Sequence, residues 1–415
     1  KLRRVGLSHE EVKGVDEDDE ARGDGPVNVL VLAPRKEARP VRKKAKLSTA
    51  IKDEVIKSIE KNLDIDAWQV GDGLSLDINR VESDFPQWFY VRKETLDIIQ
   101  VFKHTMNRKL QTVFLGTPGV GKSTLVVLFA YYMALRQKKR VLLFRKKKGG
   151  GYSMLYLDTE NQTAGKWTSW RFFILTLRQG AALCLDGLDY DVVDREFGKL
   201  GEFRLLATSV HYPMKNNDTP VLRRCLVPFW SLSDLSAIGV HLQWSNSEIK
   251  DRYFLSGGNL CDFMLERAVA MDSIELAVQV VGSSAAELLN TQYGVRSTSM
   301  RQIDRLRMAG FRVNDQSGLD KFMWSMSWCS VVTSEYALRR PGDIVKTSYY
   351  EILWSTGRML GDDGLMEVAF ENFVHTMVKE GKKIELQVRA YDRENARQHT
   401  YVAVEFEANL YRNDE

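Results

Sequence analysis

The stretch Phe114-Leu-Gly-Thr-Pro-Gly-Val-Gly-Lys-Ser-Thr124 has the spacing G-x-x-x-x-G-K-S, which ends in Lys122 and Ser123. The apolar run 112–115 before it suits a buried strand, and residues 125–135 after it suit a helix. Strand, glycine-rich loop and helix in this order are the context in which the spacing predicts a phosphate-binding loop. A glycine-rich turn without a ligand is the weaker interpretation, because every fixed position is filled and both flanks agree.

The residue types in this loop have chemical reasons. Glycines let successive backbone N–H groups turn toward phosphate oxygens, and the helix N-terminus adds partial positive charge. Lys122 is expected at the β- and γ-phosphates of a nucleotide, and the Ser123 hydroxyl at Mg²⁺. The residues expected to bind the nucleotide are Gly116, Thr117, Pro118, Gly119, Val120, Gly121, Lys122, Ser123 and Thr124.

Length and composition indicate a globular chain of two or three domains. The 415 residues are 44% hydrophobic, enough for real cores. A net charge of +4 permits contact with nucleic acid without arguing for it. No apolar run reaches about 18 residues, so no transmembrane helix is expected. Four cysteines match no metal spacing and predict buried, reduced thiols: Cys184, Cys225, Cys261 and Cys329.

The N-terminal part leads toward the loop. The chain begins at Lys1 without Met, so we expect a trimmed sequence from which a signal peptide could have been removed. The basic run 39–46 has the composition of a nuclear localisation signal, although solvated charge is the commoner meaning of such runs. Residues 47–63 have helical spacing. The aromatic run 85–92 is expected to seal the domain or to cradle an adenine edge, and a helix over 94–107 follows.

A second chemical element is the run 181–189, an apolar strand that ends in acids. Asp186 stands at the strand end, where proteins with a phosphate-binding loop keep the acid that holds Mg²⁺ through water. Asp189 follows three residues later. The residue after Asp186 is Gly187 rather than the Glu that activates water in many such enzymes. Asp189 or Glu160 are the alternatives for that role, so hydrolysis is predicted less firmly than nucleotide binding.

Two further strands carry polar residues expected near the reacting phosphate. One ends in Thr208 and Ser209, which are placed to sense a γ-phosphate or to orient water. Arg223 and Arg224 stand immediately before the expected fifth strand, where a guanidinium stabilises transition-state charge in cis or across a subunit contact. A surface pair that caps a helix is an equally good interpretation.

The order of elements predicts an α/β fold. We expect a parallel five-stranded sheet with helices on both faces, and a hairpin at 140–158 as an edge addition. From 291 to about 380 the pattern is mostly helical. Residues 384–389 and 400–407 alternate like strands.

Several short motifs occur in a set order along the chain. They lie at 27–34, 89–92, 116–123, 185–187, 227–232, 256–258 and 370–375. Together they resemble the Crinkler effectors, and beside them the retrotransposon hot spot proteins, which share an NTPase module. The matched patterns include an F-x-V-R entry, a G-x-P-G-x-G-K-[ST] loop, a P-x-W-S segment and a double glycine. At the first motif Asn28 replaces the usual His.

The resemblance implies a secreted pathogen protein that enters host cells and reaches the nucleus. Its family combines a ubiquitin-like header, a STAND/AAA-like NTPase and a nuclease domain. A nuclease core needs Asp and Glu-x-Lys, whereas 405–407 give Glu-Phe-Glu, so that domain is incomplete, replaced or lost. The implied division has five parts. Residues 1–46 are a header remnant and basic linker, 47–92 are a helical and aromatic entry segment, and 93–258 are the P-loop NTPase domain. Residues 259–380 are a helical, winged-helix-like domain, and 381–415 are a short β segment that starts a further domain.

The sequence therefore predicts an Mg²⁺-dependent P-loop NTPase that hydrolyses the β–γ bond of ATP. The absence of a guanine-reading N-K-x-D motif favours ATP over GTP. Two alternatives stay open. One is a nucleotide-gated module that docks on a host protein or DNA without useful turnover, which Gly187 favours slightly. The other is a nucleic-acid enzyme that uses ATP for remodelling. A homo-oligomer is compatible with all three.

Overall fold

The chain divides into residues Lys1–Lys46 and a compact unit, Leu47–Glu415. The computed structural model describes residues 49–146, 151–161, 163–167, 180–188, 193, 203–208, 221–281, 306–312 and 318–339, with shorter stretches at 350, 353–355, 357–358, 363–379, 384–389 and 401–406. The first resemblance motif and the basic run 39–46 lie outside these described residues.

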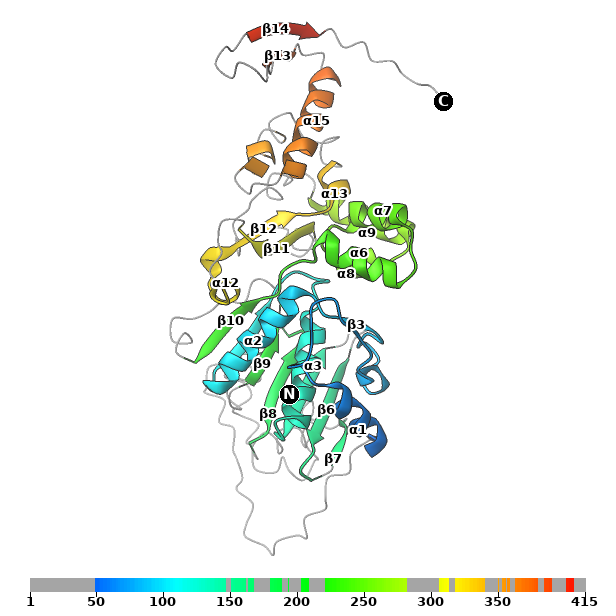
Figure 1. Cartoon of the computed structure of the whole chain (residues 1–415), viewed down its shortest axis with the longest axis vertical. Helices are drawn as coiled ribbons and strands as arrows, with labels where there is room; N and C mark the ends of the chain where they lie inside the picture. Colours follow the sequence, from blue (N-terminus) through cyan, green and yellow to red (C-terminus); the bar gives the residue numbers. More distant parts are fainter. Residues whose placement is uncertain are drawn as a thin grey trace, which may run out of the picture. The chain divides into compact units, whose positions relative to one another are not determined.

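The compact unit is built on one sheet of eight strands, in the order β1-β7-β6-β5-β8-β9-β4-β10 (Figure 1). The strands are β1 (Thr49–Ala50), β4 (Gln111–Leu115), β5 (Val141–Lys146), β6 (Tyr152–Asp158), β7 (Thr163–Trp167), β8 (Ala182–Asp186), β9 (Phe203–Ala207) and β10 (Leu222–Leu226). From β5 to β10 every neighbouring pair is parallel. β6, β7 and β1 add to this part as antiparallel strands.

The sheet is larger than the five strands expected, because the β5–β6 hairpin continues into β7 and β1. The sequence Thr-Ala-Gly-Lys-Trp of β7 has little apolar alternation, so nothing in it predicts a strand. In the parallel part, all carboxyl ends meet at one edge of the sheet. Ligands of open α/β sheets bind at that edge, and the loop after β4 and the acid at the end of β8 both lie there.

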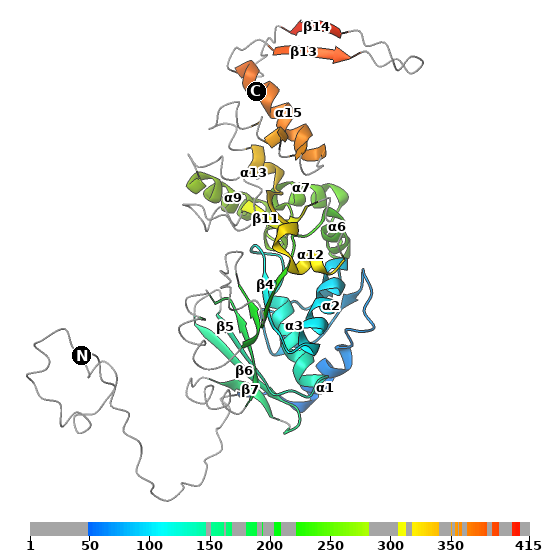
Figure 2. The same ribbon diagram turned by 90° about the vertical axis from the view of Figure 1, so that its left-hand side faces the viewer.

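One face of the sheet is covered by helices α1 (Asp53–Asn62), α2 (Lys93–Asn107) and α3 (Lys122–Leu135), which lie on the same side of it (Figure 2). α3 is buried on nearly every side, which explains its almost continuous apolar sequence. Phe102 of α2 stacks on Phe129 of α3 with ring centroids 4.1 Å apart. The expectation of helices on both faces holds for this face. On the opposite face, the buried strand residues pack with Leu188, Val193, Ala309 and Trp328.

The part after the sheet contains helices and small strand pairs. Its elements are α6 (Leu232–His241), α7 (Asn246–Ser256), α8 (Leu260–Phe263), α9 (Arg267–Val281), β11 (Arg307–Phe311), α12 (Asp320–Met323), β12 (Trp328–Val332), α13 (Glu335–Arg339), α15 (Asp363–Lys379), β13 (Ile384–Arg389) and β14 (Tyr401–Phe406). The two terminal stretches form strands, as their alternation predicts, and these strands pair antiparallel. The mostly helical pattern expected from 291 to about 380, with a break at Gly310, is interrupted by the antiparallel strand pair β11 and β12, and Gly310 lies in β11.

Three cysteines are buried as expected, and Cys261 on α8 is exposed, so the prediction is wrong for that residue. None of the helices among the described residues combines the length and the apolar character needed to cross a membrane.

Leu128→Ala should lower the free energy of unfolding by about 2–5 kcal/mol, because Leu128 on α3 is fully buried and its loss leaves a cavity. Leu276→Ala is the matched control: the same change on helix α9, at a side chain that is 59% exposed, should cost less than about 0.5 kcal/mol. Denaturant unfolding measures both variants. Equal costs would contradict the placement of α3 in the core.

Candidate functional site

The predicted phosphate loop forms the turn from β4 into α3. Gly121 precedes the helix with φ of +98°, a left-handed conformation that favours glycine, and no side chain caps the helix there. The first turn of this 14-residue helix therefore directs its backbone N–H groups and dipole toward the loop. The Lys122 ammonium donates to the carbonyl oxygen of Thr117 at 2.7 Å, so its charge lies within the loop.

The apex of the loop is covered by Asn259, the residue that caps α8. Gly119 has φ of +82°, and a Cβ added there would lie 1.7 Å from Asn259 Oδ1. Asn259 is held in place because its Oδ1 accepts from the backbone N–H groups of Cys261 and Asp262, and its Nδ2 donates to Asp262 at 2.6 Å. A glycine is needed at 119 for close approach as well as for its conformation.

The two residues predicted to bind magnesium meet across the sheet edge. Ser123 Oγ donates to Asp186 Oδ1 at 2.7 Å, although 63 positions separate them in the chain. The Asp186 side chain is buried at the end of β8. One hydroxyl and one carboxylate fit Mg²⁺, which keeps several waters and shares its coordination with substrate phosphates. Among the described residues no group of three or more His, Cys, Asp or Glu side chains forms a metal cage.

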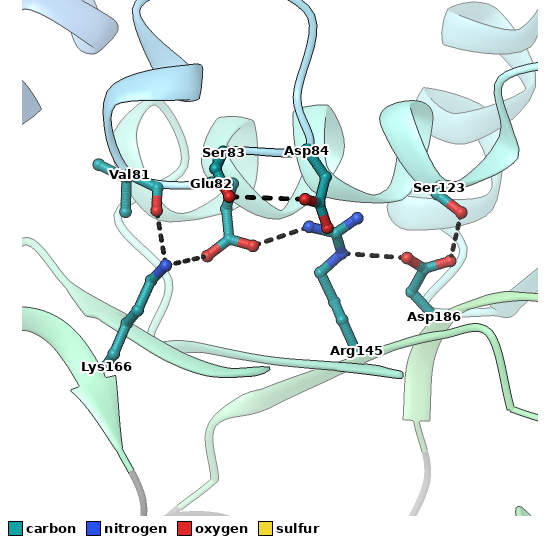
Figure 3. A network of polar contacts seen from close by, with 8 residues as sticks. All are labelled: Val81, Glu82, Ser83, Asp84, Ser123, Arg145, Lys166 and Asp186. Atoms are coloured by element: carbon teal, nitrogen blue, oxygen red, sulfur yellow. Dashed lines mark hydrogen bonds and ion pairs between the residues drawn. The ribbon is translucent and has the colours of Figure 1, made fainter. Parts of the chain in front are cut away.

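A buried ion network adjoins Asp186 (Figure 3). Arg145 on β5 donates from Nε to Asp186 Oδ2 at 3.0 Å and from Nη1 to Glu82 Oε2 at 2.7 Å. Lys166 Nζ lies 3.3 Å from the other oxygen of Glu82 and donates to the carbonyl oxygen of Val81 at 2.6 Å. Burial works against the charge on Arg145, but Asp186 and Glu82 outweigh it and raise the pKa of Arg145 above its usual value.

A second buried arginine, Arg92, ties the entry segment to the loop. It donates to the carbonyl oxygens of Phe229 at 2.9 Å, of Pro228 at 2.8 Å and of Val120 at 3.4 Å. Its guanidinium carbon lies 4.3 Å from the ring centroid of Trp230. Burial lowers the pKa of Arg92. The F-x-V-R, P-x-W-S and loop motifs noted in the sequence therefore contact one another through a single side chain.

A cavity of about 450 Å³ opens beside the loop. Its lining comes from the entry segment, the start of α3 and the helices after the sheet: Pro86, Gln87, Trp88, Phe89, Tyr90, Arg92, Thr95, Val120, Gly121, Thr124, Leu125, Trp230, Ile238, His241, Leu242, Leu260 and Met264. Trp88 stacks on His241 with centroids 3.8 Å apart and planes 6° apart. Trp230 Nε1 is buried and donates no hydrogen bond within the described part of the chain.

The segments that follow the sheet also contact the loop. Phe229 donates its N–H to the carbonyl oxygen of Ala309 on β11 at 3.0 Å, and Ala309 N–H donates to Thr117 Oγ1 at 3.5 Å. Gly258, in the predicted double glycine, packs so closely on Phe229 that an added Cβ would lie 2.7 Å from its Cβ. The loop is therefore in contact with the α7–α8 turn and with β11.

Thr208 follows β9 beside the loop strand. Its backbone N–H donates to the carbonyl oxygen of Phe114 at 3.1 Å, and its hydroxyl donates to the carbonyl oxygen of Leu188 at 2.9 Å. The structure thus places Thr208 at the edge where the loop and Asp186 meet. Ser209 and Asp189, predicted for sensing and for water activation, lie outside the described residues.

The arginine pair does not precede the fifth strand, because β10 begins at Leu222 and includes both residues. Arg223 pairs in register with Thr112, three positions before the end of β4, so it lies back along the strand from the loop. Arg224 donates to Ser325 Oγ at 3.2 Å. The expected position before the strand is therefore wrong, and the expected role of either residue at the reacting phosphate, in cis or across a subunit contact, stays a prediction.

The structure also tests Glu160, one of the two residues predicted to activate water in place of the Glu that many such enzymes carry after the strand-end Asp. Glu160 follows β6, which is antiparallel to β5 and pairs its Leu157 with Val141 at the amino end of that strand. Glu160 therefore lies at the sheet edge opposite the loop, and its proposed role in water activation is wrong. Gly187 has φ of +72°, which a Glu would adopt only with strain, and this explains why that position is a glycine.

No protein-family model matches the sequence. No curated protein matches it either. Among solved structures, the chain is similar to a Signal Transduction ATPase with Numerous Domains (STAND) protein with a tetratricopeptide repeat sensor from Pyrococcus horikoshii. The two are 11% identical, with a TM-score of 0.27, over 71% of this chain and 50% of that one. The chain thus spans half the length of that protein, and function has to be argued from its own residues.

The sequence did not single out Glu82, Arg145 or Asn259. Arg145 carries a usable signal: it is a charged residue near the carboxyl end of the apolar run Val-Leu-Leu-Phe, next to the reaction edge of a parallel sheet. Glu82 lies in an irregular segment, and Asn259 follows a double glycine, so for these two only the folded chain reveals the contact.

Gly119→Ala should cost about 1–3 kcal/mol more unfolding free energy than Gly71→Ala. Both glycines have positive φ, but only Gly119 faces a neighbour at clash distance, whereas nothing lies within 4 Å of a Cβ at Gly71. Asn259→Ala in the Gly119→Ala background should recover part of the difference, since it removes the clashing oxygen. Denaturant unfolding of the wild type, Gly119→Ala, Asn259→Ala and the double variant forms a double-mutant cycle, with Gly71→Ala as a separate control, and additive costs would contradict the contact.

Proposed function

We propose that this chain binds ATP with Mg²⁺ and hydrolyses its β–γ bond. The observation that carries the proposal is the meeting of three features at one sheet edge. They are the glycine loop at the N-terminus of α3, the Ser123–Asp186 pair, and an aromatic cavity of about 450 Å³ adjoining the loop. The nucleotide-binding class rests on the loop and this pair; the choice of ATP and the reaction are the finer parts of the proposal.

Each part of the nucleotide has a suited partner. The loop amides and the dipole of α3 suit the phosphate oxygens. Lys122 supplies charge at the β- and γ-phosphates, exchanging its Thr117 carbonyl partner for phosphate oxygens. Ser123 and Asp186 suit Mg²⁺, which neutralises charge that develops on the phosphates when bound.

The cavity suits a nucleobase. Aromatic rings from the entry segment and from Trp230 offer stacking surface, and the buried Nε1 of Trp230 offers a hydrogen-bond donor that an acceptor nitrogen of adenine would satisfy. Arg92 holds Trp230 and the loop residue Val120 in one arrangement. These contacts support a single site that spans phosphates and base.

A second candidate function is a nucleotide-gated module with turnover at background rate. It is favoured by Gly187, which stands where many such enzymes carry the Glu that activates water. The contacts of the loop with Asn259 and with Ala309 would then transmit the bound state to the following segments. Phosphate release separates the candidates: multiple turnovers support the enzyme, and tight binding with background release supports the gate.

The cellular role is also part of the proposal. We infer from the resemblance to Crinkler effectors that the protein is secreted by a pathogen and acts inside a host cell, in the nucleus, on a host protein or DNA. The ordered motifs support this inference, together with their mutual contacts around Arg92. Expression of the tagged full chain in host cells tests it, and exclusion from the nucleus would count against it.

Lys122→Ala should reduce affinity for ATP by roughly 100-fold, because it removes charge-assisted hydrogen bonds to two phosphates. The fold should persist, since Lys122 donates to the carbonyl oxygen of Thr117 within the loop itself rather than to a group in the core. Calorimetry measures binding, and circular dichroism serves as the control for folding. A folded variant that binds ATP as the wild type does would sink the assignment of the loop.

Trp230→Phe should weaken ATP about tenfold, because the ring loses its N–H donor while keeping its apolar bulk. Inorganic tripolyphosphate provides the control ligand: it has no base, so its affinity should be unchanged in this variant and lost in Lys122→Ala. Equal weakening of ATP and tripolyphosphate by Trp230→Phe would contradict a base position in the cavity.

A further inference from the structure

The buried network beside Asp186 has no part in the roles assigned so far. Arg145 is the partner of Asp186 in the β5–β8 register, and its side chain is only 10% exposed. It bridges two carboxylates that come from different parts of the chain, Asp186 on the sheet and Glu82 in the entry segment (Figure 3). Burying these charges is tolerable because each is paired.

Asp186 divides its two oxygens between two donors. Oδ1 accepts from Ser123 at 2.7 Å and Oδ2 accepts from Arg145 Nε at 3.0 Å. A carboxylate held at both oxygens cannot rotate, so the plane of the group is fixed. Oδ1, next to Ser123, is the oxygen that would face a bound Mg²⁺, and Arg145 holds the other oxygen. Arg145 therefore orients the acid without occupying its metal-binding oxygen.

Glu82 fixes Arg145 in turn. A guanidinium is a rigid fork of donors, and here Nε and Nη1 are used on different carboxylates. Glu82 is itself 3% exposed, and its second oxygen pairs with Lys166 on β7. Two cations and two anions balance within the network. Four residues after Glu82, the entry segment begins to line the cavity at Pro86.

We propose that Arg145 is a positioning residue for the magnesium acid and that Glu82 holds it in place. The entry segment then completes the metal half of the site as well as the cavity, which couples Mg²⁺ binding to the segment that receives the base. This inference rests on the proposed nucleotide-binding function. It assigns Arg145 no contact with the nucleotide, so its effect should appear in the response to Mg²⁺.

The test measures the affinity of the full chain for a non-hydrolysable ATP analogue by calorimetry, in EDTA and over a series of Mg²⁺ concentrations. Arg145→Gln should leave the metal-free affinity within about twofold and reduce the enhancement by Mg²⁺ about tenfold, the loss typical of a charge-assisted hydrogen bond. Arg145→Lys should recover only part of the enhancement, because an ammonium lacks the fork that spans both carboxylates. Glu82→Gln should act in the same direction with a smaller effect.

Arg252→Gln is the matched control. Arg252 is also largely buried, with 16% side-chain exposure, and pairs with Glu248, but it lies on α7 and does not line the cavity. Mg²⁺ should raise the affinity of this variant for the ATP analogue as much as it raises that of the wild type. If Arg145→Gln does not fold, Arg145→Lys and Glu82→Gln carry the same test.

The outcomes separate this inference from the function on which it rests. A wild-type chain that binds no analogue under any condition would overturn the proposed function. A wild-type chain that binds with Mg²⁺ enhancement, beside Arg145 and Glu82 variants with the same enhancement, would overturn the positioning role alone. A loss of enhancement in those variants but not in Arg252→Gln supports it.

Discussion

The hydrogen bond from Ser123 to Asp186 is the contact on which the rest of the site depends. It joins the start of α3, which follows β4, to the end of β8, across the intervening strand β9. The contact exists because β4 and β8 run parallel and end at the same edge of the sheet. Reversing either strand would place the two groups at opposite edges of the sheet. A different strand order would move them apart along the same edge. The fold therefore serves chiefly to bring a hydroxyl and a carboxylate, 63 positions apart in the chain, to hydrogen-bonding distance.

Around that contact, residues of the entry segment contact both the phosphate loop and, through Arg145, the magnesium acid Asp186. Arg92 fixes three carbonyl groups between the loop and the strand-end segment at Pro228 and Phe229, and Glu82 reaches the magnesium acid through Arg145. Both arginines are buried, but their partners differ. Arg92 contacts neutral carbonyls and has its pKa lowered by burial, whereas Arg145 is paired with carboxylates that outweigh burial. The contacts of Arg92 suit a residue that holds backbone segments together. The contacts of Arg145 suit a residue that positions the acid proposed to bind Mg²⁺.

Much of this could be predicted from the sequence, and the limits have physical reasons. Local patterns are strong where one residue type is required, as at Gly121 with its positive φ, and where burial on all sides leaves an apolar run, as in α3. The strand at β7 could not be predicted, because its sequence Thr-Ala-Gly-Lys-Trp carries no regular apolar alternation. Arg223 and Arg224 were placed wrongly because β10 begins three residues earlier than its apolar run indicates.

The prediction that Glu160 activates water failed because sequence distance does not tell which edge of the sheet a hairpin reaches. Asn259 and Glu82 matter only through contacts distant in the chain.

The central claim is that a triphosphate and magnesium bind together at the carboxyl edge of the parallel strands. Titration of the unaltered chain with a non-hydrolysable ATP analogue, with and without Mg²⁺, tests this most directly. We expect one site per chain, tightened when Mg²⁺ is present. An absence of binding heat for ATP and GTP analogues alike, with the chain folded, would contradict the account.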